Sequence, residues 1–282
     1  MEHFNHDVFR GPRLTLPVLV IALCVLFATA VPGRAATSIT LCPFIIATPG
    51  NYELATDLAC PAYGILINAS GVSLKLNGHT ITGSVGVIYG IAVFPPTGRL
   101  DHVTIEGPGL IRNFEIGISV VQTDYAQVAL VTSARNGEGL VATECSYLTV
   151  GSSAFVGNSD IGVAFQGSNS VFQYNDLSGN TYGLLIYPSG AATVNNNTAN
   201  GNRAAGIFII QGNNSRVFAN VTNGNGTVGI QVLTPTSGNQ IFNNTSSVGN
   251  GTVDLEDDNS PSCGSTLWNN NVFFTRSPAC IR

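Results

Sequence analysis

A short hydrophobic pattern recurs along the chain from about residue 64 to residue 255. A glycine followed by an aliphatic residue returns every 21–27 residues, and a second short apolar segment lies between consecutive copies. Short strands with alternating polarity, and no helical stretch between them, fit a solenoid in which each coil lies parallel on the previous one. An antiparallel sandwich would lack this regular register. The repeat glycines are Gly64, Gly90, Gly117, Gly139, Gly162, Gly183, Gly206 and Gly229, with Asp254 in the ninth place.

Asparagines accompany this repeat, three or four residues before most of its glycines. In a stacked coil, equivalent side chains lie about 4.8 Å apart, so their amides can hydrogen-bond to one another as a ladder. The glycine before each strand is expected to supply a turn conformation that other residues avoid. The expected ladder consists of Asn113, Asn136, Asn158, Asn180, Asn202, Asn225 and Asn250.

The polarity of the positions after each repeat glycine predicts two faces. The first and third residues are almost all aliphatic and are expected to point into the core. The second and fourth residues then face outward, and many of them are also apolar, which is typical of a contact or binding surface. On this surface Phe94, Tyr187 and Phe208 could stack on sugar rings. The alternatives are that the surface mediates self-association or is covered by a terminal segment of the chain. The outward apolar residues are Leu66, Phe94, Val121, Val141, Leu185, Tyr187, Phe208, Ile210 and Leu233.

Three acidic residues, Glu115, Glu138 and Asp160, follow consecutive ladder asparagines by two positions. If they stack, their repulsion must be relieved, and we expect Arg112 and Arg135 to relieve it. The functional interpretations are a calcium site or the acid and base of a polysaccharide lyase or glycoside hydrolase. Carboxylates on adjacent coils would suit a retaining glycosidase, and those on alternate coils an inverting one. The alternative is a surface ion-pair ladder without catalysis.

The amino-acid composition of the chain excludes several classes of protein. Only 10% of the 282 residues are charged and the net charge is −5, so a nucleic-acid-binding protein is not expected. The 44% of hydrophobic residues exclude a disordered chain, and the few charged residues disfavour a helix bundle.

No zinc-type ligand spacing is present, so no cofactor is expected apart from the calcium considered above. Short repeat spacings leave little room for the loops that wall a substrate cleft, which favours a non-catalytic role. Asp257 and Asp258, beside the end of the repeat, are expected to be structural.

The N-terminus carries the features of a secretory signal peptide. Arg10 and Arg13 precede an apolar run over residues 14–31, and Pro32 and small residues follow. Cleavage is expected after Ala35, which gives a secreted or periplasmic protein that leaves the membrane. An uncleaved membrane anchor is the alternative, because the run is about long enough to span a bilayer.

Five cysteines remain after this segment. In an oxidising compartment the economical pairing is Cys42 with Cys60 and Cys263 with Cys280, each closing a short loop. Cys145 is then left unpaired, and we expect it to be a small buried hydrophobic residue.

Three features of the sequence point to a known family. They are the periodicity, an opening segment over residues 52–60 and 72–81, and a closing segment over residues 263–280 that contains the only tryptophan. The chain resembles secreted bacterial right-handed parallel β-helix repeat proteins of the pectate-lyase-like superfamily. The resemblance implies an all-β fold, a single-stranded right-handed parallel β-helix (solenoid) of about nine coils with disulfide-closed caps. We assign residues 1–35 to the signal peptide, 36–63 to an N-terminal cap, 64–258 to the repeats and 259–282 to a C-terminal cap. An extracellular carbohydrate-binding or structural module is expected, with a cell-surface glycan or polysaccharide as partner.

Overall fold

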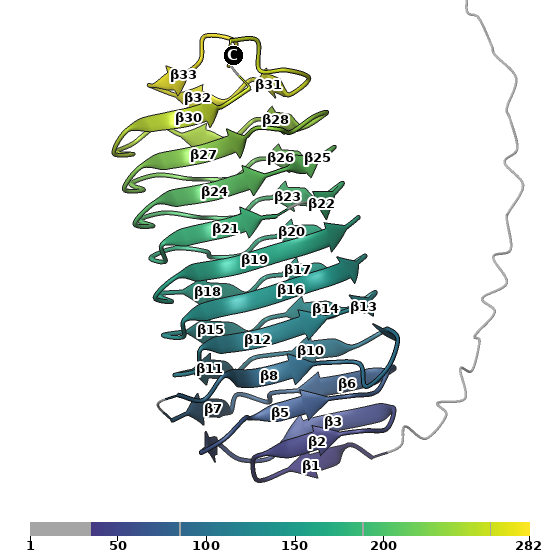
Figure 1. Cartoon of the computed structure of the whole chain (residues 1–282). Helices are drawn as coiled ribbons and strands as arrows, with labels where there is room; N and C mark the ends of the chain where they lie inside the picture. Colours follow the sequence, from purple (N-terminus) through teal and green to yellow (C-terminus); the bar gives the residue numbers. More distant parts are fainter. Residues whose placement is uncertain (1–34, 85, 188, 260) are drawn as a thin grey trace, which may run out of the picture. The chain divides into compact units, whose positions relative to one another are not determined.

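The computed structural model describes residues 35–282, apart from residues 85, 188 and 260. The expected signal peptide, except for its last residue, lies outside the described residues. Within them no helix is long and apolar enough to cross a membrane. Short strands follow one another along the chain, and the coils of the solenoid contribute strands to three sheets, here called A, B and C (Figure 1).

Sheets A and B run along the whole described solenoid. Sheet A contains β1 (Thr37–Ile39), β3 (Gly50–Leu54), β6 (Val72–Lys75), β10 (Thr104–Glu106), β14 (Gln127–Ala129), β17 (Thr149–Gly151), β20 (Val171–Gln173), β23 (Thr193–Asn195), β26 (Arg216–Phe218), β28 (Gln240–Phe242) and β31 (Leu267–Asn269). The main path of sheet B contains β2 (Phe44–Ile46), β5 (Ile65–Ile67), β8 (Tyr89–Val93), β12 (Ile116–Val121), β16 (Glu138–Ser146), β19 (Ile161–Ser168), β21 (Tyr182–Ile186), β24 (Ala205–Ile210), β27 (Val228–Leu233), β30 (Val253–Asp257) and β33 (Arg276–Ser277).

The remaining strands are shorter. Sheet C contains β4 (Leu58–Cys60), β7 (Thr80–Gly83), β11 (Leu110–Arg112), β15 (Thr132–Ala134) and β18 (Ala154–Val156), and it continues as isolated bridges to β29 (Thr245–Ser246) and β32 (Val272–Phe273). Four two-residue strands extend sheet B toward sheet A: β9 (Leu100–Asp101), β13 (Thr123–Asp124), β22 (Ser189–Gly190) and β25 (Gly212–Asn213).

Every pair of neighbouring strands in the described chain is parallel and links one coil to the next. The expectation of an all-β parallel solenoid is therefore confirmed, with about ten turns where about nine were expected. Sheet strands also extend into both segments assigned as caps: β1 to β4 lie within 36–63, and β31 to β33 lie within 259–282.

Aliphatic side chains from all three sheets fill the interior. The first and third residues after each repeat glycine point inward as expected, and Ile118, Leu140, Leu184 and Ile207 are fully buried. Because equivalent positions stack in register, the interior columns consist mainly of apolar residues over many coils. This burial of apolar surface is the main favourable contribution to folding.

Buried asparagine ladders follow two of the three turns. In the turn between sheets C and B, the Asn158 amide N–H donates to Asn180 Oδ1 at 2.9 Å, and the Asn180 N–H donates to Asn202 Oδ1 at 2.9 Å. This ladder comprises Asn136, Asn158, Asn180, Asn202, Asn225 and Asn250. A second ladder, which the sequence analysis missed, lies between sheets A and C and comprises Asn175, Asn197, Asn220, Asn244 and Asn271.

One expected ladder member lies elsewhere. The residue whose N–H donates to Asn136 Oδ1 is Phe114, not Asn113. Asn113 precedes it with a positive φ of 63°, in the place that Arg135 occupies on the next coil with a φ of 58°. The expectation that Asn113 joins the ladder is therefore wrong by one residue.

The repeat glycines are required by the close approach of neighbouring coils, not by a turn conformation. None of the eight from Gly64 to Gly229 has a positive φ. A Cβ atom on Gly139 would lie 2.5 Å from the carbonyl oxygen of Gly162, and one on Gly162 would lie 2.5 Å from that of Gly183. Positive φ angles fall instead on glycines just before the ladder, such as Gly179 with 74°.

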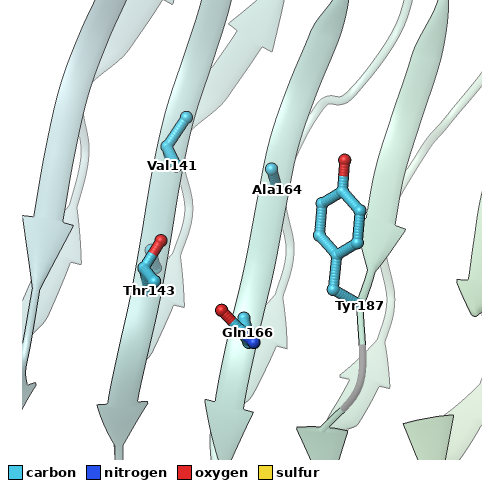
Figure 2. A pocket seen from close by; sticks show the side chains of 6 residues that line it. Val141, Thr143, Ala164, Gln166 and Tyr187 are labelled. Carbon is cyan, nitrogen blue, oxygen red and sulfur yellow. The ribbon is translucent and has the colours of Figure 1, made fainter. Parts of the chain in front are cut away.

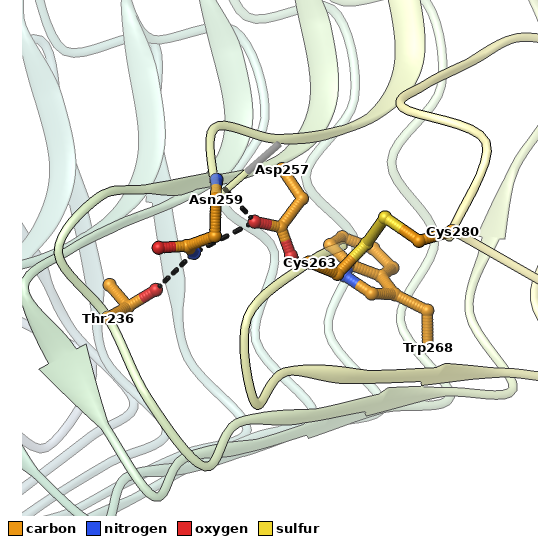
Figure 3. Close-up of a disulfide and its surroundings, with 6 residues drawn as sticks. All are labelled: Thr236, Asp257, Asn259, Cys263, Trp268 and Cys280. Carbon is orange, nitrogen blue, oxygen red and sulfur yellow. Dashed lines mark hydrogen bonds between the residues drawn. A yellow bond between two sulfur atoms is a disulfide. The ribbon is translucent and has the colours of Figure 1, made fainter. Parts of the chain in front are cut away.

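Both predicted disulfides are present, Cys42–Cys60 and Cys263–Cys280. Cys145 is free and fully buried, as expected, and burial raises the pKa of its thiol to about 11. At the C-terminal end, the indole N–H of Trp268 donates to Asp257 Oδ2 at 2.7 Å next to the second disulfide (Figure 3). The buried Asp257 also accepts two hydrogen bonds from Asn259, so its role in the described chain is structural.

Replacing a central ladder asparagine tests how far the ladder stabilises the fold. Asn180→Ala removes the acceptor of the Asn158 N–H and the donor to the carbonyls of Phe155 and Leu177. Each buried group left without a partner costs about 1–3 kcal/mol, so thermal and urea unfolding should show a clear loss of stability. Asn51→Ala is the control, because Asn51 is exposed and has no side-chain partner among the described residues. Equal stability of the two variants would contradict this role.

Candidate functional site

The outer face of sheet B carries the residues predicted to bind a ligand. Val141 and Phe208, which are second residues after repeat glycines, and Phe94 and Val121, which are fourth residues, are partly exposed on this face. Other second residues are buried although they face outward: Ala92, Ser119, Ala164 and Leu185, of which Leu185 is only 4% exposed. Leu185 packs with Ile161 and Ala164 in a small cluster on the outside of the sheet.

A pocket of about 220 Å³ lies on this face across β16, β19 and β21 (Figure 2). We call it the Tyr187 pocket. Val141 and Ala164 line its apolar part, and Thr143 and Gln166 contribute polar groups; the strand that carries Ala164 and Gln166 lies between Thr143 and Tyr187. The sequence analysis did not select Thr143 and Gln166 because it retained only the apolar members of the outward column. Their place, four residues after a repeat glycine, was the signal that could have identified them.

Tyr187 directly follows β21 and is 38% exposed. Its ring lies along the sheet, and its hydroxyl points back toward the beginning of the strands (Figure 2). Burial, followed by the negative charges of Glu138 and Asp160, raises the pKa of the Tyr187 hydroxyl. The hydroxyl is therefore a neutral hydrogen-bonding group over the physiological pH range.

The other two candidate sugar-stacking residues lie apart from this pocket. Phe208 stacks on Tyr182, with ring centroids 5.6 Å apart and the planes inclined by 11°. At least one face of its ring is therefore occupied by protein, and we expect Phe208 to contribute to stability as well. Phe94 follows β8 and packs edge-on against Tyr89, and β12 separates it from the Tyr187 pocket.

The three acidic candidates do not form one column. Glu138 pairs with Ile116, and its N–H donates to the carbonyl oxygen of Glu115, so Glu115 lies one residue out of register. The N–H of Asp160 donates to the Gly137 carbonyl oxygen in the same pattern, which places Asp160 opposite Glu138 on the adjacent coil. The offset of Glu115 has the same origin as that of Asn113.

Glu138 and Asp160 thus form a pair of neighbouring carboxylates. Burial, and then the negative charge of Asp160, raises the pKa of Glu138. Within the described residues neither Arg112 nor Arg135 forms an ion pair with them, and Arg112 instead donates to Thr82 Oγ1 at 3.2 Å. The expected relief of repulsion by arginine is therefore wrong within the described residues.

The described part of the chain holds no group of three or more His, Cys, Asp or Glu side chains arranged to bind a metal ion. The calcium interpretation of Glu115, Glu138 and Asp160 therefore stays a prediction. At the C-terminal end of the same face, Glu256 and Asp258 also have raised pKa values, caused first by burial and then by a neighbouring aspartate.

Comparisons with known proteins identify the architecture. The sequence matches the family model described as "Right handed beta helix region" over residues 63–246. A search of the curated proteins finds no sequence that matches this chain.

Several solved structures are similar to the described solenoid. The Dettilon tailspike protein (gp208) is 14% identical with a TM-score of 0.66, covering 86% of this chain and 54% of its own. The periplasmic alginate epimerase AlgG is 16% identical with a TM-score of 0.59, covering 77% of this chain and 62% of its own. A DFA-IIIase from Arthrobacter chlorophenolicus A6, without its lid and in complex with GF2, is 13% identical with a TM-score of 0.63, covering 82% and 70%. The chain thus spans less than two thirds of the first two proteins, and identities this low show the shared fold alone.

Removing the charge of Glu138 tests the origin of its raised pKa. A carboxyl with a raised pKa stabilises the fold only while protonated, and this stability is lost as the pH rises through its folded pKa. Glu138→Gln should therefore be as stable as the wild type at neutral pH or slightly more stable, by at most about 1 kcal/mol for a partly exposed group. Below the ordinary Glu pKa of 4.5, the difference should disappear.

Thermal unfolding between pH 3 and pH 8 measures this difference, with Glu115→Gln as the control for an exposed carboxylate that is out of register. A Glu138→Gln variant clearly less stable than the wild type at neutral pH would mean that a cation compensates Glu138 instead.

Proposed function

The chain belongs to the right-handed β-helix family, and from this we propose that it is an extracellular or periplasmic carbohydrate-binding protein that binds glycans on the outer face of sheet B. Residues 63–246, which match the family model, include every strand that lines the Tyr187 pocket. Two disulfides support a location outside the cytoplasm, because such bonds persist in oxidising compartments. The similar structures support a carbohydrate ligand, since they include an alginate epimerase and a DFA-IIIase in complex with GF2.

The observation that carries this proposal is the composition of the Tyr187 pocket. Val141 and Ala164 offer apolar surface, the Tyr187 ring offers an amphipathic wall, and Thr143 and Gln166 offer hydrogen-bonding groups. Binding sites for small molecules typically combine a mainly apolar lining with a few polar groups that fix orientation. A sugar ring has the matching chemistry, with C–H groups on its faces and hydroxyls around its edge.

A second candidate function is hydrolysis or elimination at a glycosidic linkage, favoured by the raised pKa of Glu138. A general acid needs a pKa raised toward the working pH, and burial, followed by the negative charge of Asp160, shifts the pKa of Glu138 in this direction. Adjacent parallel strands lie about 4.8 Å apart, which is compatible with the about 5–5.5 Å between the carboxyl groups of retaining glycosidases. Asp160 would then be the nucleophile or base.

Binding is tested with a panel of immobilised neutral and uronate-containing polysaccharides. Tyr187→Ala should weaken binding about tenfold or more, which corresponds to a loss of about 1.4 kcal/mol. Thermal stability should change little, because Tyr187 is 38% exposed. Tyr174→Ala is the matched control, since Tyr174 is 59% exposed on the turn between sheets A and C. Equal binding by both variants would refute the proposed site, and a changed oligomeric state of Tyr187→Ala would favour self-association.

Catalysis is tested on the same panel by measuring reducing ends and unsaturated uronates. If Glu138 is a general acid, Glu138→Gln should abolish turnover and leave polysaccharide binding intact, whereas Glu115→Gln should retain turnover. Binding without product release in the wild type would eliminate the catalytic candidate and leave the binding function standing.

A further inference from the structure

We infer that the N-terminal part of sheet B carries a second binding site, separate from the Tyr187 pocket, for an uncharged six-membered ring that bears hydroxyl groups. The site is a pocket of about 390 Å³ beside β5 and β8. We call it the Phe94 pocket. β12 lies between it and the strands that line the Tyr187 pocket. Its main lining residues are Tyr63, Tyr89, Phe94, Pro95, Pro96 and Asn68.

The aromatic rings give this pocket its shape. Tyr89 and Phe94 pack edge to face, with centroids 5.5 Å apart and planes inclined by 63°. Aromatic pairs favour this edge-to-face arrangement, and both rings line the pocket. Tyr63 lies on the preceding coil, just before Gly64, and lines the same pocket. A flat ligand can therefore contact aromatic surface on more than one side.

The outer wall of the pocket is held rigidly. Residues 94–99 leave the sheet after β8, and two consecutive prolines, Pro95 and Pro96, restrict the backbone of this segment. Arg99 at its end binds Asp124 on the next coil through two hydrogen bonds, Nη2 to Oδ1 at 2.6 Å and Nε to Oδ2 at 2.9 Å. Arg99 Nη2 also donates to the carbonyl oxygen of Glu144, a further coil along, at 2.6 Å. One side chain thus ties the wall to two other coils.

This attachment joins the wall to the next coil through a bidentate, charged contact. Bidentate arginine–carboxylate pairs are among the stronger hydrogen-bonded contacts in proteins. The hydrogen bond from Arg99 lowers the pKa of Asp124, so the pair stays charged across neutral pH. A wall that is ordered before binding reduces the entropy lost when a ligand enters, which improves affinity.

Volume and charge define the ligand. An apolar cavity of about 150 Å³ holds a benzene ring, so about 390 Å³ accommodates one ring with its substituents. None of the described residues that line the pocket is charged, so a carboxylate would lose its hydration without gaining a cation. The side chain of Asn68 has no hydrogen-bond partner among the described residues, and its amide can both donate to and accept from hydroxyls. A phenol and a neutral pyranose share this chemistry.

Calorimetric titration with small glycosides tests this site. Phenyl β-glucoside should bind saturably, and phenyl β-glucuronide, which carries a carboxylate in place of the hydroxymethyl group on the same rings, should bind about tenfold more weakly or worse. Methyl β-glucoside and phenol separate the two sources of the ring: binding of the first identifies a pyranose and binding of the second an aromatic group. Failure of all four to bind at millimolar concentration would overturn the inference.

Three variants locate the binding. Phe94→Ala should weaken phenyl β-glucoside about tenfold, and Tyr187→Ala should leave it unchanged, which separates this site from the proposed polysaccharide site. Arg99→Ala should weaken it through the loosened wall, with partial recovery in Arg99→Lys. Equal weakening by Phe94→Ala and Tyr187→Ala, or no effect of Phe94→Ala in a variant that unfolds like the wild type, would refute the assignment.

Discussion

The register between successive coils is the constraint on which the rest of this structure depends. A parallel solenoid could slide by one residue at each coil, which would turn interior side chains outward. The buried asparagines oppose such a slip: the carboxamide oxygen of Asn180 accepts the backbone N–H of Asn158 on the preceding coil, while its amide donates to the backbone carbonyl of Phe155. A slip would leave these groups without partners in the interior, where unpaired polar groups are costly. The ladders thus set the register that hydrophobic burial alone would specify less strictly.

Fixed register brings residues from consecutive coils into columns on the outer face of sheet B. Thr143, Gln166 and Tyr187 are far apart in sequence but lie on consecutive coils at the same position, so together they line one pocket. The same stacking brings Glu138 and Asp160 close enough for one charge to raise the pKa of the other. Where the chain leaves this regular path, as in residues 94–99, a separate hydrogen-bonded attachment by Arg99 takes over the positioning.

The fold could be predicted from the sequence because periodic glycines, asparagines and aliphatic residues repeat a single structural unit. The inward columns were predicted for the same reason, and both disulfides were predicted because each closes a short loop in an oxidising compartment. Errors arose where spacing varied by one residue. Asn113 precedes Phe114, which holds the ladder position, and this shift moved Glu115 out of the predicted acidic column. The role of the repeat glycines was also misread, since contact between coils leaves no trace in the local sequence.

The candidate site was less predictable because its properties depend on neighbours across coils. Polarity marked Leu185 as exposed, but adjacent coils cover it, and Phe208 has a stacking partner in Tyr182.

The central claim is that the outer face of sheet B is the ligand-binding surface. A crystal structure of the protein with an oligosaccharide taken from the polysaccharide that it binds tests this claim most directly. The account predicts a sugar ring in contact with Tyr187, within reach of Thr143 and Gln166. An oligosaccharide bound on the outer faces of sheets A or C instead, with the Tyr187 pocket empty, would contradict it.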